Sequence, residues 1–116
     1  MSLSVKEIER LLDEHEAQWD SGFFWWKNES DRNDGEHVEG LGKVWVVEEY
    51  GGGEGGTEDM HIVFRVREDS AQYRWQVRYF RKDGFYASFG ESTWDGGFFE
   101  VKPVQRTVTV YEEVKK

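Results

Sequence analysis

Four arginines in the middle of the chain have the spacing that places side chains on one face of a β-strand. Arg65 and Arg67 are two residues apart, and Arg74 and Arg78 are four apart. Side chains alternate between the two faces of a strand, so each pair shares a face. If a hairpin pairs the two strands, the four guanidinium groups form one patch. Guanidinium groups bind carboxylates and phosphates, so the patch predicts an anionic ligand or an acidic partner.

The same arginines have a second interpretation, because the chain carries 24 acidic side chains against 15 basic ones, a net charge of −9. Residues 1–60 alone hold 16 of the acids, and these could pair with the arginines inside the molecule. Both interpretations stay open at this point. The negative balance also argues against direct nucleic-acid binding, which depends on cations that displace the counterions of phosphate.

Aromatic residues form the second candidate site. Tyr86, Phe89 and Trp94 lie beside the glycine-containing loop at Gly90, where exposed rings could stack on a partner's side chain, a base or a sugar. The alternative is that these rings pack in the core of a chain with few aliphatic residues. The predicted ligand- or partner-binding residues are therefore Arg65, Arg67, Arg74, Arg78, Tyr86 and Trp94.

Residues for catalysis or metal binding are sparse. General acid–base chemistry would use His61 with a neighbouring carboxylate, or Asp95 with Glu91, but no nucleophile lies in a strand–turn–helix elbow. The acidic loop around Gly35 places its glycine one residue early for an EF-hand, and Gly51–Gly56 lacks the lysine of a phosphate-binding loop. We therefore expect no catalytic residue, metal site or cofactor, and rank a small hydrolase or isomerase below a binding protein.

A helix is predicted at the N-terminus. Ser4 and Glu7 have capping-box spacing, and an apolar stripe follows at three- and four-residue steps, which predicts an amphipathic helix from Val5 to Trp19. The aromatic run Phe23–Trp26 comes next. It predicts either a short buried strand or a buried plug under the sheet, or else an exposed surface for a partner.

The rest of the chain predicts strands. Asn28–Gly42 is expected to be a loop, and Asp83–Gly84 a two-residue hairpin turn. The predicted strands are Lys43–Val47, Met60–Arg67, Tyr73–Tyr79, Phe85–Phe89, Phe98–Lys102 and Val104–Val114. The fold class is therefore α+β: an N-terminal amphipathic helix packed on a twisted antiparallel sheet of five or six strands, mostly connected by hairpins, in a single domain of residues 1–116.

The composition favours the cytoplasm. The chain has no cysteine, which excludes disulfides and fits a reducing compartment. No apolar run approaches the length of a membrane span, and the N-terminus does not have the pattern of a signal peptide. We therefore expect a cytoplasmic protein without membrane contact.

The C-terminal third carries a resemblance. Residues 79–112 contain Tyr-Phe-Arg-Lys-Asp-Gly-Phe-Tyr-Ala-Ser, then Trp-Asp-Gly, then Glu-Val-Lys-Pro-Val and Thr-Val-Thr-Val-Tyr-Glu. In these runs the chain resembles small acidic proteins encoded by bacteriophages, most of them uncharacterised. The resemblance implies a location in the host cytoplasm and an accessory role, including inhibition of a host factor.

The functional hypothesis is a non-enzymatic binding protein that acts on a protein partner through an acidic and aromatic surface. It combines uneven charge with many aromatic residues and no chemical motif. The first alternative is a module that binds an anionic nucleotide or metabolite on an arginine-rich sheet face. Under the leading hypothesis, the binding protein could also act as a homodimer.

Overall fold

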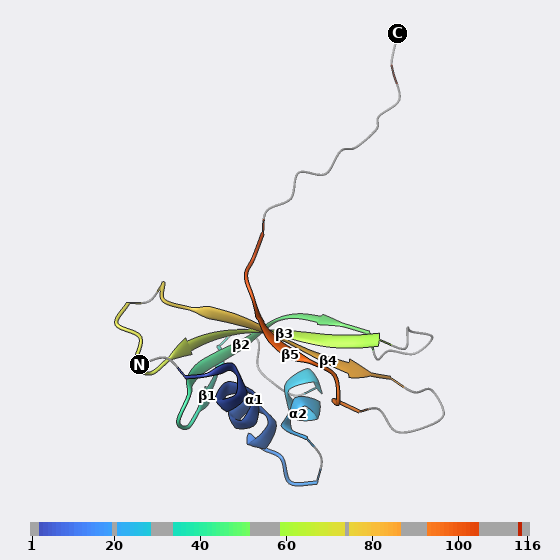
Figure 1. The fold of residues 1–116 in the computed structure, drawn as a ribbon, viewed down its shortest axis with the longest axis horizontal. Coiled ribbons are helices and arrows are strands. Elements are labelled where there is room, and N and C mark those ends of the chain that lie inside the picture. The colour runs from blue at the N-terminus through green and yellow to red at the C-terminus, as the bar shows by residue number, and fades with distance from the viewer. Residues whose placement is uncertain are drawn as a thin grey trace.

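One antiparallel sheet organises the structure. The computed structural model describes residues 3–19, 21–28, 34–51, 59–73, 75–86, 93–104 and 114. The elements are α1 (Val5–Glu14), α2 (Gly22–Asn28), β1 (Glu36–Val38), β2 (Gly42–Tyr50), β3 (Asp59–Glu68), β4 (Arg78–Phe85) and β5 (Phe98–Val101). Each strand pairs with the next in sequence, so the order is β1-β2-β3-β4-β5 (Figure 1). The predicted α+β class with an antiparallel sheet is confirmed.

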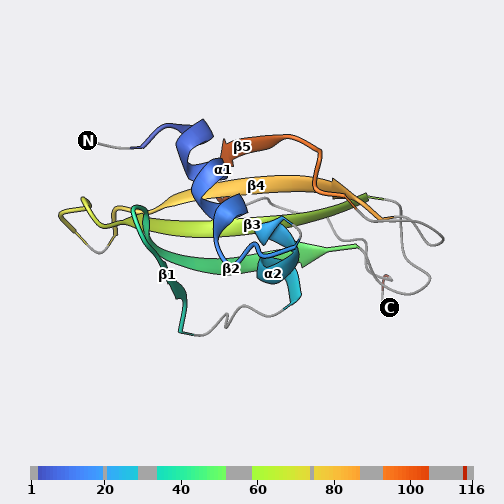
Figure 2. The same ribbon diagram turned by 90° about the horizontal axis from the view of Figure 1, so that it is seen from below.

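The two faces of the sheet differ in what covers them. Both helices lie on the same side (Figures 1 and 2). Alternate residues of β3 point to that side and are buried: Met60, Ile62, Phe64 and Val66. They pack with Ile8 and Leu12 of α1 and with Phe23 and Trp26 of α2. Because side chains alternate along a strand, the odd-numbered residues of β3 lie on the opposite side, here called the open face.

Helix α1 begins as predicted and ends early. The Ser4 hydroxyl accepts a hydrogen bond from the Glu7 backbone N–H at 3.2 Å, which caps the first turn. The helix ends at Glu14, and Glu16 adopts a positive φ of 57°. This left-handed residue turns the chain away from the helix axis. Trp19, predicted to end the apolar stripe, is consequently 92% exposed.

The aromatic run Phe23–Trp26 forms helix α2, so the predicted strand is wrong and the predicted buried plug under the sheet is confirmed. Ser21 supplies the cap, because its hydroxyl accepts from the Phe23 N–H at 3.1 Å. Phe23 and Trp26 are one turn apart and fully buried, and Phe24 and Trp25 pack partly against the core. Most of the run is therefore core, and the alternative of an exposed partner surface is wrong.

The predicted hairpin turn at Asp83–Gly84 is also wrong. Both residues lie inside β4, where Asp83 pairs with His61 and Gly84 with Met60. The ten-residue β3 is long enough to hold β4 straight through this position. Gly84 serves close packing, since a Cβ there would lie 2.5 Å from Cε3 of Trp94. The chain instead turns between the end of β3 at Glu68 and the start of β4 at Arg78, so the first part of the predicted strand Tyr73–Tyr79 belongs to this connection.

The remaining predicted elements have mixed outcomes. β1 lies inside the predicted loop Asn28–Gly42. β5 begins at Phe98 as predicted and ends at Val101, one residue earlier than the predicted end at Lys102. Residues 87–89 and 105–113 of two other predicted strands lie outside the described residues. Within the described part of the chain, no helix is long and apolar enough to cross a membrane.

Candidate functional site on the open face

The pairing of β2 with β3 brings four functional side chains together on the open face. Lys43 lies opposite Arg67, and Trp45 opposite Arg65. The Lys43 Nζ is 5.3 Å and the Arg65 Cζ 4.9 Å from the centre of the Trp45 ring. Both distances are within the range of cation–π attraction. These four residues are called the cationic cluster below.

A close backbone contact between β2 and β3 fixes the positions of Lys43 and Arg67. Gly42 has φ +142°, and a Cβ there would lie 2.2 Å from the Arg67 carbonyl oxygen. The Asp69 N–H donates to the Leu41 carbonyl oxygen at 2.9 Å. The start of β2 is thus pressed against the end of β3, which fixes the strand positions of Lys43 and Arg67.

The cations of the cluster have no acidic partner among the described residues. Three carboxylates on β2, on β4 and directly after the end of β3 have other partners: Glu48 pairs with His61 at 2.7 Å, Asp69 with His37 at 3.4 Å, and Asp83 with Arg81 at 2.7 Å. No ion pair joins Lys43, Arg65 or Arg67 to a carboxylate in the described part of the chain. The Arg65 Nε is buried and has no hydrogen-bond partner. Within the described part of the chain, the cluster is therefore a group of three positive charges that form no ion pair.

Arg78 does not join the cluster. It pairs with Val66 in the register, so it lies on the helix side of the sheet, opposite to Arg65. There its guanidinium donates to both carboxylate oxygens of Glu100, at 3.1 and 2.8 Å, and to the Leu3 carbonyl oxygen at 2.7 Å. The hydrogen bonds with Glu100 raise the pKa of Arg78 and hold the pKa of the Glu100 carboxyl below its ordinary value. The expected patch of four arginines is not formed, and Arg74 lies outside the described residues.

The two aromatic candidates belong mainly to the core. Trp94 is 6% exposed, and its ring packs against Phe23 and Phe24 with centroid distances of 6.1 and 6.2 Å. Tyr86 is partly buried against the same core. Neither residue lies on the open face, so the structure does not place them beside Arg65 and Arg67.

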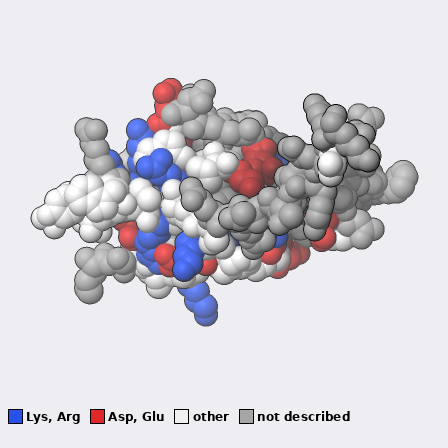
Figure 3. Space-filling view, turned by 90° about the horizontal axis from the view of Figure 1, so that it is seen from above, with Lys and Arg blue, Asp and Glu red and all other residues white. Residues whose placement is uncertain are grey.

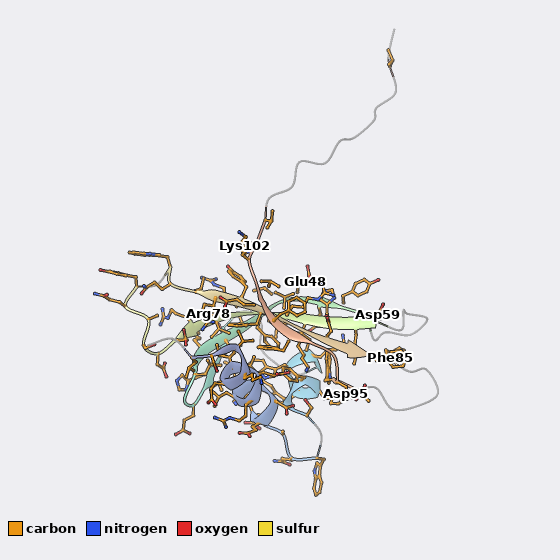
Figure 4. All side chains as sticks on the ribbon, viewed as in Figure 1. Glu48, Asp59, Arg78, Phe85, Asp95 and Lys102 are labelled. Carbon is orange, nitrogen blue, oxygen red and sulfur yellow. The ribbon has the colours of Figure 1, made fainter. Side chains whose placement is uncertain are left out.

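A groove of about 500 Å³ adjoins the cluster. It is lined by Val47, Glu48, Val63, Tyr79, Arg81 and Val101, and residues 102–104 form one wall. Tyr79 lies opposite Arg65 in the register, so the groove and the cluster are neighbours on one face. Figure 3 shows Lys and Arg side chains gathered toward the left end of this face, and Figure 4 shows Glu48 and Lys102 on the side away from the helices.

Sequence reasoning missed Lys43 and Trp45. In the predicted strand Lys43–Val47, the run Val44–Val47 is apolar at every position, which predicts a strand that is apolar on both faces. Lys43 and Trp45 alternate with the buried Val44 and Val46, and this pattern could have indicated that Lys43 and Trp45 share the less buried face of the strand. The pattern alone does not place Lys43 and Trp45 beside the arginines. That placement follows from the register of β2 against β3, which pairs Lys43 with Arg67 and Trp45 with Arg65.

The residues considered for catalysis do not assemble into a larger site in the described part of the chain. His61 stacks on Tyr50 with a centroid distance of 5.3 Å, and its Nε2 is 2.7 Å from Glu48. Asp95 is exposed, and Glu91, its predicted partner, lies outside the described residues. No group of three or more histidine and carboxylate side chains among the described residues could hold a metal ion.

Comparisons of the chain with protein-family models, with curated proteins and with solved structures found no match. The evidence for the candidate site is therefore its own geometry and charge. The resemblance to bacteriophage-encoded proteins stays a prediction.

Proposed function

We propose that the chain is a non-enzymatic binding protein whose cationic cluster and adjoining groove hold an acidic, partly apolar segment of another protein. The observation that supports this most strongly is that Lys43, Arg65 and Arg67 form no ion pair with a carboxylate among the described residues, in a molecule of net charge −9. As in the sequence-based hypothesis, the proposed partner is a protein. The charge of the proposed binding surface is different, because the sequence-based hypothesis used an acidic surface. The surface is cationic and aromatic, although the whole chain is acidic.

The charges in the cluster favour an anionic partner. Adjacent strands are about 4.8 Å apart, so three like charges on two neighbouring strands repel one another. A carboxylate from a partner would offset this repulsion and form charge-assisted hydrogen bonds. Trp45 already restrains Lys43 and Arg65 through the ring contacts, which reduces the entropy lost on binding.

The groove favours a protein segment over a free small anion. Its apolar lining, Val47, Val63 and Val101, lies beside the cluster on the same face. Arg67 and Val63 are four residues apart on β3, which is about 13 Å along a strand. An extended segment with two acidic and then two apolar side chains at alternate positions is about 20 Å long between the first and last of them, so it covers this distance and continues along the groove. A small anion would occupy the cluster and leave the groove empty.

The test uses a heptapeptide with blocked ends, Glu-Ser-Glu-Ser-Leu-Ser-Leu, and isothermal titration calorimetry. We expect saturable binding that weakens as salt is added, because screening reduces the attraction between exposed charges. Changing Arg65→Gln and Arg67→Gln together is expected to weaken binding at least about tenfold, since bonds to charged groups each contribute about 1.5–3 kcal/mol.

Three controls make this test specific. The double change Lys6→Gln and Arg10→Gln on α1 removes the same net charge from exposed positions and is expected to leave the affinity within about twofold. A peptide with lysines in place of glutamates is expected not to bind. Inorganic phosphate separates the small-anion alternative: if phosphate binds as tightly as the peptide, or if both double variants weaken the peptide equally, the proposal is wrong.

The biological setting stays part of the proposal. If the chain acts as a bacteriophage accessory protein, the host cytoplasm is its place of action, and an acidic host protein is the partner that the cationic cluster fits. An inhibitory role follows if that segment of the host protein is needed for its own activity.

A further inference from the structure

An exposed pair of aromatic rings lies on the loop between β3 and β4. Tyr73 and Trp75 stack with a centroid distance of 4.5 Å and an angle of 9° between the rings. Trp75 is 73% exposed and Tyr73 is 45% exposed. Neither ring belongs to the hydrophobic core. Trp and Tyr are the side chains that contribute most often to the centre of protein interfaces.

The loop that carries the ring pair is held by its own hydrogen bonds. The Gln76 side-chain oxygen accepts from the backbone N–H groups of Gln72 and Tyr73 at 2.7 and 2.8 Å. The Gln76 N–H donates to the Tyr73 carbonyl oxygen at 3.1 Å, and the Val77 N–H donates to that of Trp75 at 2.9 Å. The rings are thus presented by an ordered turn, so little entropy is lost when they enter an interface.

A hollow of about 320 Å³ lies in the same loop. It is lined by Ala71, Gln72, Gln76 and Val77, with Glu68 and Arg78 at the adjacent strand ends. Tyr73 and Trp75 do not line it. One short segment therefore carries an aromatic projection and a concave surface large enough for one ring system. A two-fold symmetric interface requires a patch that is complementary to itself, and adjacent projecting and concave surfaces meet this requirement.

We propose that the occupant of this hollow is Trp75 of a second copy of the chain. In the resulting two-fold dimer, residues 69–73 and 75–77 of one copy pack against the same residues of the other, and each Trp75 fills the hollow of the partner subunit. The patch is small, and interfaces below about 1,200 Å² of total buried area belong to weak, reversible complexes. The dimer is therefore concentration-dependent, and it strengthens as salt screens the repulsion between two chains of net charge −9.

The loop lies outside the cationic cluster, so the dimer does not depend on the proposed function. If both hold, one dimer presents two clusters. Two linked sites bind a partner with two acidic segments more tightly than one site does.

The test is sedimentation equilibrium of the full chain over a range of concentrations. We expect reversible dimers for the unaltered chain and at least about tenfold weaker association for Trp75→Ala, because hot-spot truncations cost about 2 kcal/mol or more. Trp19→Ala is the matched control, since Trp19 is even more exposed but lies far from this loop in sequence. A monomer at every concentration, or an equal effect of both substitutions, would overturn the proposal.

A mixing experiment tests the contact itself. Ala71→Leu is expected to block the hollow and weaken self-association while leaving Trp75 intact. A mixture of Trp75→Ala and Ala71→Leu chains restores one correct insertion per dimer, so it is expected to associate more tightly than either variant alone. If both variants have the circular dichroism spectrum of the parent chain and the mixture shows no gain, Trp75 does not occupy the hollow and the proposal is wrong.

Discussion

Trp26→Ala is expected to lower the free energy of unfolding by about 3–5 kcal/mol, the range measured when large core aromatics are truncated. Trp26 is fully buried and joins the two helices to the sheet. Its Nε1 donates to the Leu12 carbonyl oxygen of α1 at 3.1 Å, and its ring meets Phe64 of β3 edge-to-face at 5.5 Å. Removing the indole therefore leaves a cavity at the centre of the helix layer.

Urea denaturation followed by circular dichroism measures this loss. Small domains have a total stability of about 5–15 kcal/mol, so the variant is expected to retain only part of its cooperative transition. Trp19→Ala removes the same side chain from a 92% exposed position and is expected to change stability by less than about 0.5 kcal/mol. Equal losses in the two variants would mean that α2 does not pack on the sheet as described.

Gly42→Ala is expected to destabilise the chain by about 3 kcal/mol and to disturb the cationic cluster. Gly42 has φ +142°, which a side-chain-bearing residue adopts at a cost of about 1–3 kcal/mol. The added Cβ would also lie 2.2 Å from the Arg67 carbonyl oxygen, so the end of β3 must move. Overpacking of this kind adds about 1–3 kcal/mol.

The same denaturation experiment checks the size of this effect, with Gly97→Ala as the matched control. At Gly97 the nearest atom to an added Cβ belongs to the Phe99 ring, 3.7 Å away, and no positive φ is required. We expect a change of less than about 1 kcal/mol there. Unchanged stability in Gly42→Ala would show that β2 and β3 are not held together at this contact.

The fold class could be predicted because periodicity and capping are local signals. Ser4 and Glu7 marked the helix start, and the alternation along Met60–Val66 marked β3 and its buried face. The errors came from packing. Phe23–Trp26 has no clear period, and its helix depends on Ser21 as a cap and on a core that accepts Phe23 and Trp26 one turn apart.

The prediction of a turn at Asp83–Gly84 was wrong for a different physical reason. The dipeptide favours a two-residue turn in isolation, but the same glycine also allows Trp94 to approach the strand closely. The pairing of β4 with β3 continues past this dipeptide to Asp59 and Phe85, so Asp83 and Gly84 lie within the strand and do not form a turn. The strand pairing and the contact with Trp94 therefore outweighed the local preference of the dipeptide for a turn.

Only half of the candidate site could be derived from the sequence. The shared face of Arg65 and Arg67 follows from their spacing. Their partners Lys43 and Trp45 depend on the register of β2 against β3, which spacing within one strand does not contain. Arg78 had suitable spacing as well, but its register placed it on the helix side, where Glu100 neutralises it.

The most direct test of the proposed function is a map of where the acidic heptapeptide contacts the chain. Amide and indole N–H chemical shifts of the ¹⁵N-labelled protein would be followed during titration with the peptide. We predict saturable shifts concentrated at Lys43–Trp45 and Val63–Arg67, including the indole N–H of Trp45, with smaller changes at Tyr79 and Val101 in the groove. Shifts confined to α1 or to the loop 69–77, or the absence of any saturable shift, would contradict the assignment of the open face as the binding site.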